Sequence, residues 1–456
     1  MAKKKQIELT IEEKLRNALV PKEEQPYKIP SNWCWSYWKY CGKFIAGNGF
    51  KNIYQGFTQY DIPYYKVGSL KFCDEGNYLI DETNTINEEI RTKLKAVKIP
   101  VNSIIFAKIG EAIKLNRRCL NKIECCIDNN LMAFISEKYF YKYIFYWTKS
   151  LNFYELTNAT TVPALRKTDL ENIPIPLPPL NEQQRIVNRI ESLFAKLDRA
   201  KELIENTLAQ FEENKMAILH KAFIGELTAK WRKENNIDLS SWQEKTVDEL
   251  CTSLKYGTSK KSNPEGSVVV LRMGNLQNGE IDWSNLMYTD DKDDIEKYLL
   301  KKGDVLFNRT NSPELVGKTS IYRGEYPAIY AGYLIKLDYG KDIIGEYLNY
   351  MMNSTKAKHY CYTVKTDGVS QSNINAKKIG AFEIPVPTIE EQQEIVNILD
   401  RLLAKYNKIK NLEQQLEKIE LLKKAILAKA FRGELGTNNP DEESAENLLK
   451  EILAEK

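Results

Sequence analysis

The stretch IPLPPLNEQQRIVNRI occupies residues 175–190, and the chain repeats it as IPVPTIEEQQEIVNIL at residues 384–399. In both copies a proline-rich segment leads into apolar residues spaced by three and four, which is typical of a helix that packs along another helix. Neither copy contains a residue pattern known for catalysis. The repeat therefore indicates a structural or recognition element that the protein needs twice.

The two copies belong to a duplication that covers most of the chain. Trp33 matches Trp242 at the same offset of 209 residues, and KAFIGEL at residues 221–227 returns as KAFRGEL at residues 429–435. Matches from the first quarter of each half to its end indicate two tandem modules rather than one shared motif. The helical segments are nearly copied, whereas the segments between them differ in length and content.

Each repeated stretch predicts the start of a long helical arm. The apolar positions are Ile186, Ile190, Leu193, Leu197, Ala200, Ile204 and Phe211 in the first arm, and Ile395, Leu399, Leu402, Tyr406, Ile409 and Leu416 in the second. The sequence predicts a first helix over about residues 181–224, capped by Asn181 with Gln184, and a second capped by Thr388 with Glu391. Gly225 and Gly433 stand where these helices are expected to end. One antiparallel coiled-coil pair is the simplest arrangement, and ordinary helical core packing is the alternative.

The remaining segments predict a mixed α/β (α+β) fold in two globular domains, separated by the two antiparallel arms in a pseudo-twofold duplication. Short strand-like runs alternate with turns such as Asn278-Gly279 and with helical runs. The expected segments are a helical extension at 1–28, globular domains at 29–176 and 231–386, arms at 177–230 and 387–436, and a tail at 437–456. Helices opening at Thr10, with Glu13, and near Ser444 are expected to be appendages.

Composition predicts an ordinary cytoplasmic protein. The chain has a net charge of +4, 43% hydrophobic and 28% charged residues, and no apolar run close to the roughly 20 residues of a membrane span. Its start lacks the apolar core of a signal peptide. The eight cysteines include no Cys-x-x-Cys pair, so no structural metal is expected.

The sequence contains no recognisable catalytic site. Its two histidines, His220 and His359, have no cysteine or carboxylate pattern beside them that would indicate a triad or a metal site. No phosphate-binding loop is present, and the acidic run from Asp290 is typical of a solvated loop. We therefore expect a protein that recognises a partner and has no active site of its own.

Polar residues that follow strand-like runs are the candidates for recognition. Arg and Lys can pair with guanine, and Asn and Gln with adenine, through two-point contacts in the major groove of DNA. The candidates are Lys108, Lys114, Asn116, Arg117, Arg118, Thr160 and Thr161 in the first module, and Arg272, Asn275, Asn308, Arg309, Thr310, Asn311, Ser370, Gln371 and Asn373 in the second. For each of them the alternative is an ordinary turn or solvent-exposed polar residue.

The charge balance differs between the modules. Residues 29–176 contain 19 Lys and Arg against 14 Asp and Glu, whereas residues 238–386 contain 19 against 20. Attraction of DNA phosphates supplies much of the affinity of DNA-binding proteins. We therefore expect a partner to contribute part of any DNA affinity.

The combination of these motifs closely resembles the specificity subunit of Type I restriction-modification systems. The resemblance is carried by IPLPPLNEQQRIV, KAFIGELT, GDVLFNRTNSPELVGK and the N-terminal EEKLRNALVPKEEQPYKIPSNW, and it spans essentially the whole chain. It implies that the globular parts are target recognition domains, each reading half of a split, asymmetric DNA site. It also implies that the arms form a spacer that fixes the gap between the half-sites.

The resemblance further implies protein partners and their cofactors. Two modification subunits, which bind S-adenosylmethionine and methylate adenine, are expected to dock on the chain. Restriction subunits, which translocate DNA with ATP and Mg, are expected to join them. The candidate docking and spacer residues are Gln183, Gln184, Ile186, Ile190, Leu193 and Leu197, with Gln392, Gln393, Ile395, Leu399, Leu402 and Tyr406. The chain itself is expected to be non-catalytic and to bind no cofactor.

Two other classes of function remain as alternatives to DNA specificity. A duplicated coiled-coil scaffold would bind only proteins, and a stand-alone nuclease would cleave DNA with a metal ion. From the polar cluster around it, we expect Arg309→Ala to weaken recognition of one half-site by about 1 to 3 kcal/mol.

Overall fold

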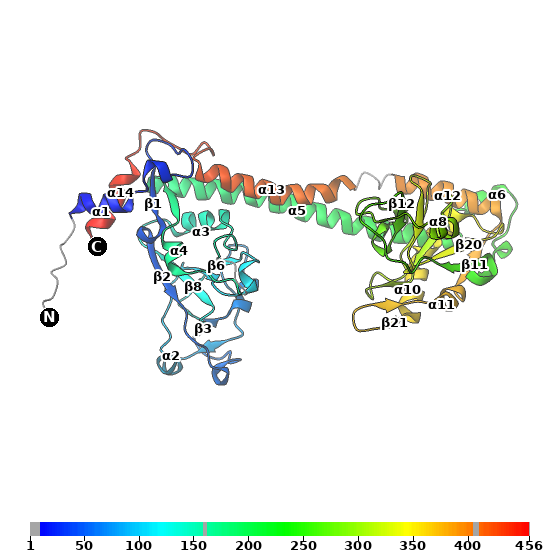
Figure 1. Ribbon diagram of the computed structural model, residues 1–456, viewed down its shortest axis with the longest axis horizontal. Helices are drawn as coiled ribbons and strands as arrows, with labels where there is room; N and C mark the ends of the chain where they lie inside the picture. The colour runs from blue at the N-terminus through cyan, green and yellow to red at the C-terminus, as the bar shows by residue number, and fades with distance from the viewer. Residues whose placement is uncertain (1–9, 158–161, 405–409, 456) are drawn as a thin grey trace. The chain divides into compact units, whose positions relative to one another are not determined.

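The computed structural model describes residues 10–157, 162–404 and 410–455 (Figure 1). The chain forms two compact units, one of residues 1–202 with 415–456 and the other of residues 203–414. Each unit contains one mixed α/β domain and parts of the helical arms, which confirms the predicted fold class. The first unit therefore includes both the beginning and the end of the chain.

The first unit is built on a four-stranded antiparallel sheet and a smaller three-stranded sheet. The larger sheet has the order β2 (Gly42–Ala46), β8 (Leu131–Ser136), β5 (Ile104–Ala107) and β6 (Arg118–Leu120). The smaller has β4 (Thr85–Ile86), β3 (Ile62–Tyr65) and β7 (Cys126–Ile127), with β3 and β7 parallel. The helices of this domain are α2 (Glu88–Leu94), α3 (Tyr141–Ser150) and α4 (Lys167–Glu171). All four residues of β5 are buried in the core.

The second unit repeats this topology. Its four-stranded sheet has the order β11 (Cys251–Tyr256), β20 (Leu334–Tyr339), β16 (Val305–Asn308) and β18 (Thr319–Ile321). Its three-stranded sheet has β15 (Tyr288–Thr289), β12 (Val268–Leu271) and β19 (Ala328–Tyr330), again with one parallel pair. Helices α7 (Val247–Leu250), α8 (Lys292–Tyr298), α9 (Gly345–Met352), α10 (Thr355–Val364) and α11 (Ala376–Gly380) complete the domain. The matching strand orders show that the whole module is duplicated.

Two short sheets have no counterpart among the named strands of the first domain. One is the hairpin of β13 (Leu276–Gln277) and β14 (Glu280–Ile281). The other has the order β17 (Thr310–Asn311), β22 (Ser372–Asn373) and β21 (Thr366–Asp367). It joins two segments about 60 residues apart that both contain candidate recognition residues.

The proline-rich segments before the arms are strands. In the first unit β9 (Pro174–Leu177) pairs antiparallel with β1 (Cys34–Tyr37), and in the second β23 (Glu383–Val386) pairs with β10 (Gln243–Thr246). Both sheets have only two strands, so the missing amide hydrogens of the prolines cost no ladder hydrogen bond on the open side. Each pair brings the start of a domain beside the beginning of an arm.

The arms are the helices α5 (Leu180–Phe223), α12 (Ile389–Ala404) and α13 (Lys410–Phe431). In the first unit Lys423 pairs with Asp198 and Lys201 pairs with Glu420, so helices α5 and α13 run antiparallel there. The apolar positions follow the predicted seam. Ile186, Ile190, Ile395 and Leu399 are fully buried, and Leu193, Leu197, Ala200, Ile204, Phe211, Leu402 and Leu416 are half-buried. Tyr406 and Ile409 lie outside the described residues.

The ends of the arms agree with the predicted signals except at one cap. Helix α5 begins at Leu180, and the carbonyl oxygen of Pro179 accepts from the amides of Glu182 and Gln183, so the predicted Asn181 cap is wrong. Before α12, Thr388 Oγ1 accepts from the Glu391 amide at 3.4 Å, as predicted. Gly225 and Gly433 have φ of 80° and 74° and end the two arms. Such left-handed conformations favour glycine.

A buried carboxylate at the start of each arm ties the helix to its own domain. Trp33 Nε1 donates to Glu182 Oε2 at 2.8 Å, and Trp242 Nε1 donates to Glu391 Oε2 at 2.9 Å. Both carboxylates are fully buried. The two pairs are related by the offset of 209, so the same junction is built twice. We call Glu182 and Glu391 the junction carboxylates.

The second oxygen of each junction carboxylate accepts from a threonine. Thr437 donates to Glu182 at 3.4 Å and Thr228 donates to Glu391 at 2.6 Å. The remaining partners differ, because the first junction uses the neutral amide of Asn438 and the second uses the buried guanidinium of Arg232 at 2.5 Å. Burial raises the pKa of Glu182 despite these hydrogen bonds. The second junction has a positive charge to balance its carboxylate.

The glutamine that follows each junction carboxylate is also committed to the fold. Gln183 accepts from the amide of Phe140, just before α3, and donates to the Pro178 carbonyl. Gln392 repeats this pattern with the amide of Ile344, just before α9, and the Pro387 carbonyl. Both side chains are fully buried. They therefore attach the domain helix to the arm and are not available to a partner.

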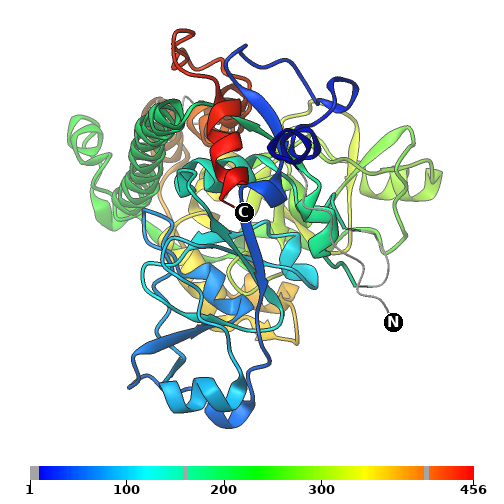
Figure 2. The same ribbon diagram turned by 90° about the vertical axis from the view of Figure 1, so that its left-hand side faces the viewer.

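The two terminal helices are part of the first unit's core, contrary to the expectation that they are appendages. Helices α1 (Ile11–Ala18) and α14 (Ala445–Ala454) pack side by side (Figure 2), and their buried side chains belong to the main core cluster. The predicted caps are confirmed, since Thr10 and Glu13 form a capping box and Ser444 accepts from the Glu446 amide. The capping residues indicated the helices but not the apolar surface that covers them.

We predict that Glu391→Ala lowers the free energy of unfolding by about 3 to 5 kcal/mol, because it leaves the buried Arg232 charge without its partner. Urea unfolding followed by tryptophan fluorescence measures this loss. Glu391→Gln keeps an acceptor for Trp242 and should cost less. The control is Glu383→Ala, which removes an exposed carboxylate from β23. Equal stability of the Glu391→Ala and Glu383→Ala proteins would contradict the role of the junction.

Candidate nucleic-acid interface

The second domain gathers several predicted recognition residues at the end of β16. This strand ends at Asn308, and the chain continues through Arg309 into β17, which pairs with β22 through Thr310 opposite Asn373. Asn373 Nδ2 donates to Thr310 Oγ1 at 2.7 Å. Thr310, Asn311 and Asn373 are half-buried. The short sheet therefore brings two predicted clusters together, which their separation in sequence did not reveal.

Arg309 supports this sheet rather than projecting from it. Its guanidinium lies 4.9 Å from the centre of the Tyr256 ring and donates to the Asn373 side chain at 3.1 Å and to the Gly332 carbonyl at 3.3 Å. Its Nε is buried without a hydrogen-bond partner. Arg309 is half-buried and positions Asn373 through this hydrogen bond. Arg309 packs on the ring of Tyr256, a residue that the sequence analysis did not single out.

The exposed candidates of the second domain lie at the tip of the β21–β22 hairpin. Ser370 and Gln371 are exposed, and the Gly368 amide donates to the Gln371 carbonyl at 2.8 Å to close the turn. Behind the tip, buried Ser372 and the amine of Lys365 both bind the Asp367 carboxylate. The tip therefore presents polar side chains on a braced support.

Two other candidates of the second domain are buried inside it, and a third, Arg272, is half-buried. Asn308 is fully buried and Asn275 is 3% exposed, and the Asn275 side chain bonds the backbone of Arg272 and Asp282. Arg272 donates to Asn285. The burial of Asn308 and Asn275 does not favour the base contacts expected of them, because buried polar atoms are not presented to a ligand. Arg272 lines an open groove, so its base contact stays a prediction.

In the first domain the candidates also divide between exposed and buried positions. Lys114 and Arg117 are exposed, Lys108 and Asn116 are half-buried, and Arg118 is 4% exposed. Arg118 donates to the backbone carbonyls of Asn116 and Leu151 and stacks on Phe153 at 3.8 Å, so it is a structural residue. Burial lowers the pKa of Arg118 to about 9. Thr160 and Thr161 lie outside the described residues.

A groove in each unit separates the domain from an arm helix at matching positions. The first is lined by Arg117, Lys149, Glu420 and Lys423, and the second by Lys318, Asn353, Glu212 and Lys215. The arm residues of the two grooves are related by 208 positions, the offset between KAFIGEL and KAFRGEL, and Arg117 and Lys318 each stand just before the last strand of the large sheet order, β6 or β18. Burial lowers the pKa of Lys149 in the first groove and of Lys318 in the second. The duplication therefore extends to the surface between domain and arm.

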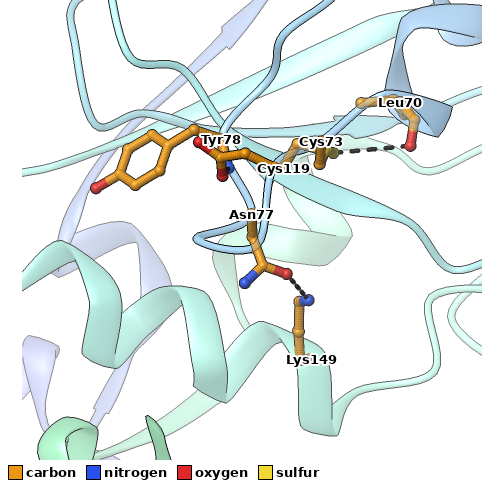
Figure 3. The surroundings of a disulfide bond; sticks show 7 residues. Leu70, Cys73, Asn77, Tyr78, Cys119 and Lys149 are labelled. Atoms are coloured by element: carbon orange, nitrogen blue, oxygen red, sulfur yellow. Dashed lines mark hydrogen bonds between the residues drawn. A yellow bond between two sulfur atoms is a disulfide. The ribbon is translucent and has the colours of Figure 1, made fainter. Parts of the chain in front are cut away.

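The floor of the first groove contains a disulfide bond, which the sequence pattern did not indicate. Cys73 is bonded to Cys119 of β6 (Figure 3). Close to it, Lys149 Nζ donates to Asn77 Oδ1 at 2.5 Å. Burial, followed by repulsion from Arg118 and Lys423, lowers the pKa of Lys149 to about 8, although Asp198 acts in the opposite direction.

The candidate docking residues of the arms occupy different surfaces. Gln184 and Gln393 are exposed and each bonds the asparagine four residues ahead on its own helix. The buried Gln183 and Gln392 face the domain instead. Of the two predicted glutamines in each copy, only the second is therefore accessible to a partner.

The described residues show no cluster of three histidine, cysteine or carboxylate side chains that would hold a metal ion. Within the same residues no helix combines the length and apolarity needed to cross a bilayer. His220 and His359 are both exposed.

Comparison with known proteins agrees with this architecture. Residues 52–210 and 240–421 match the family described as "Type I restriction modification DNA specificity domain". The EcoKI specificity subunit of Escherichia coli K12 is 30% identical over 315 residues, covering 66% of this chain and 68% of that subunit. The StySPI specificity subunit of Salmonella potsdam is 29% identical over 335 residues, or 69% of this chain and 71% of that one.

A solved structure shares the fold. It is described as addressing complex assembly and conformational transition of the type I restriction-modification system, and its chain aligns with a TM-score of 0.66 and 19% identity over 90% of this chain and 100% of that one. Because the family match covers both modules, the chain belongs to the type I restriction-modification DNA specificity subunits.

We predict that Lys149→Met is at least as stable as the parent protein at pH 7, because burying the charged amine is unfavourable. Above about pH 8 the folded parent loses this proton before the unfolded chain does, so its stability relative to Lys149→Met rises until about pH 10.5. Urea unfolding at pH 7 and pH 10 tests this change. Lys424→Met removes one positive charge at an exposed position of the same groove and is the control. A pH-independent difference would contradict the lowered pKa of Lys149.

Proposed function

We propose that this chain is the non-catalytic subunit that selects the DNA sequence for a type I restriction-modification complex, with each globular domain reading one half of a bipartite, asymmetric site. The observation that carries the proposal is the pair of domains with one topology and different residues at matching sequence positions. At the offset of 209, Ser370 and Gln371 correspond to Thr161 and Val162. Domains of one shape with different side chains suit two half-sites of different sequence.

The partners in this proposal are two modification subunits and the restriction subunits that join them. S-adenosylmethionine belongs to the modification subunits, and ATP and Mg to the restriction subunits. The exposed Gln184 and Gln393, at equivalent positions of the two arms, support two equivalent docking events. The two matching grooves support the same stoichiometry.

Methylome sequencing of a host that expresses the chain with its modification subunit tests the proposal directly. The expected result is methylated adenine within a split site of two different half-sites and a constant gap. A gel shift with the same complex gives an independent reading of sequence-dependent binding. A scaffold that binds only proteins would leave both the methylome and the gel shift without sequence dependence.

We predict that Gln371→Ala weakens binding to one half-site by about 1 to 3 kcal/mol, because its exposed amide can make two-point base contacts. The other half-site and the free energy of unfolding should not change. Arg309→Ala should weaken the same half-site and also lower stability, because Arg309 holds Asn373 and packs on Tyr256. Competition binding with half-site variants and urea unfolding measure the two effects. Gln210→Ala, at an exposed arm position outside the candidate residues, is the control for the hairpin.

A second prediction concerns the arms as the spacer. Four residues inserted after the exposed Glu205 lengthen α5 by about 6 Å, since a helix rises about 1.5 Å per residue. We expect both half-sites to persist while the preferred gap between them changes. Methylome sequencing of the variant reads the half-sites and the gap together. An unchanged gap with normal methylation would exclude the spacer role.

A further inference from the structure

The tip of the β21–β22 hairpin carries an apolar side chain with no protein surface to cover it. Val369 and Ser370 are the two turn residues, because Gly368 and Gln371 close the hairpin through a 2.8 Å hydrogen bond. Among the large apolar side chains of the described residues, Val369 has the highest relative exposure. A single exposed apolar residue is common on protein surfaces and needs a second observation before it suggests function.

The second observation is the bracing of the hairpin beneath this tip. Asp367 is held by Ser372 and Lys365, and Asn373 is held by Thr310 and Arg309. The support places the turn at a defined position without burying any part of Val369. Because a preordered contact residue loses less conformational entropy on binding, such a tip is suited to recognition.

The third observation is the chemistry around Val369. Its neighbours Ser370 and Gln371 are exposed hydrogen-bonding residues, and the exposed amine of Lys377 follows on α11. A two-stranded ribbon fits the major groove of DNA, where lysines can pair with phosphates at the groove edge. The apolar group that bases present in this groove is the 5-methyl group of thymine.

We propose that Val369 reads a thymine by packing against its 5-methyl group in the half-site recognised by the second domain. This inference rests on the proposed function, because it assigns one residue a role within DNA reading. Val369 thereby supplies an apolar contact beside the polar contacts of Ser370 and Gln371. The first module has Thr160 at the matching sequence position, so the two domains differ in the chemistry of this contact.

Replacing thymine by deoxyuridine removes only the methyl group and gives a direct test. The chain in complex with its modification subunit is titrated with duplexes in which each thymine of the Gln371-dependent half-site is replaced in turn. At one position the substitution should weaken binding of the parent complex by about threefold to tenfold, the scale expected for one apolar contact. Val369→Ser should weaken binding to unmodified DNA to a similar degree and should be insensitive to that deoxyuridine.

Two further variants separate contact from general damage. Val369→Ile keeps an aliphatic side chain and should retain sensitivity to the same deoxyuridine. Val101→Ser makes the same type of change at an exposed valine of the first domain and should behave like the parent complex. Unchanged urea unfolding of all three variants shows that they fold.

The inference is overturned if the effects of Val369→Ser and of every deoxyuridine multiply independently, or if the half-site contains no thymine. A change in DNA bending with Val369→Ser but no coupling to a methyl group would also overturn it, because this result indicates a wedge between bases. If the parent complex shows no sequence-dependent binding at all, the proposed function is refuted instead. If the parent complex binds DNA in a sequence-dependent way but Val369→Ser and the deoxyuridine substitutions act independently, only the thymine contact is refuted.

Discussion

The junction between a buried carboxylate and a tryptophan is the constraint on which each unit depends. Glu182 and Glu391 stand at the first turn of an arm, and each accepts from a tryptophan at the start of its domain. A buried carboxylate is tolerated only when donors satisfy it, so the position of the helix relative to the domain is closely specified. The glutamine beside each carboxylate adds a second attachment at the helix that follows the large sheet.

With the arm fixed in this way, each domain can change its exposed surface without changing its attachment. The large sheets keep the same strand order in both units, and both junction carboxylates accept from a tryptophan and a threonine. The exposed side chains that differ include those on loops and short strands, such as the β17–β22–β21 sheet of the second domain. Recognition residues are commonly carried by loops on a rigid support, and here the support is duplicated while the loops are not.

The helical arms and the duplication were predictable from sequence because their signals are local or repeated. The seam residues, Thr388 and the two terminal glycines of the arms follow from periodicity and from capping chemistry. The repeat also contains Gln183 and its counterpart Gln392. The sequence does not distinguish a glutamine that faces a partner from one that forms hydrogen bonds within its own domain. Asn181 failed as a cap because the helix begins at Leu180, directly after Pro179, so that Asn181 lies inside its first turn.

The candidate site was less predictable because burial decides which polar residues are available. Asn308 and Ser370 are both plausible base readers in sequence, yet Asn308 is fully buried and Ser370 is exposed. The pairing of β17 with β22 joins segments about 60 residues apart and has no local signal. Arg309 shows the same limit, since its charge suggests contact with DNA whereas its neighbours make it a support for Asn373.

The composition of the two units suggests how such a chain arose. The first unit combines its own domain and the start of α5 with the end of α13, which belongs to the other module, and the second unit combines the end of α5 with α12. A single module would lack the returning helix and could obtain it from a second copy. Fusion of two such exchanged copies into one polypeptide would then free each half to acquire its own preference, as a homodimer of identical readers cannot.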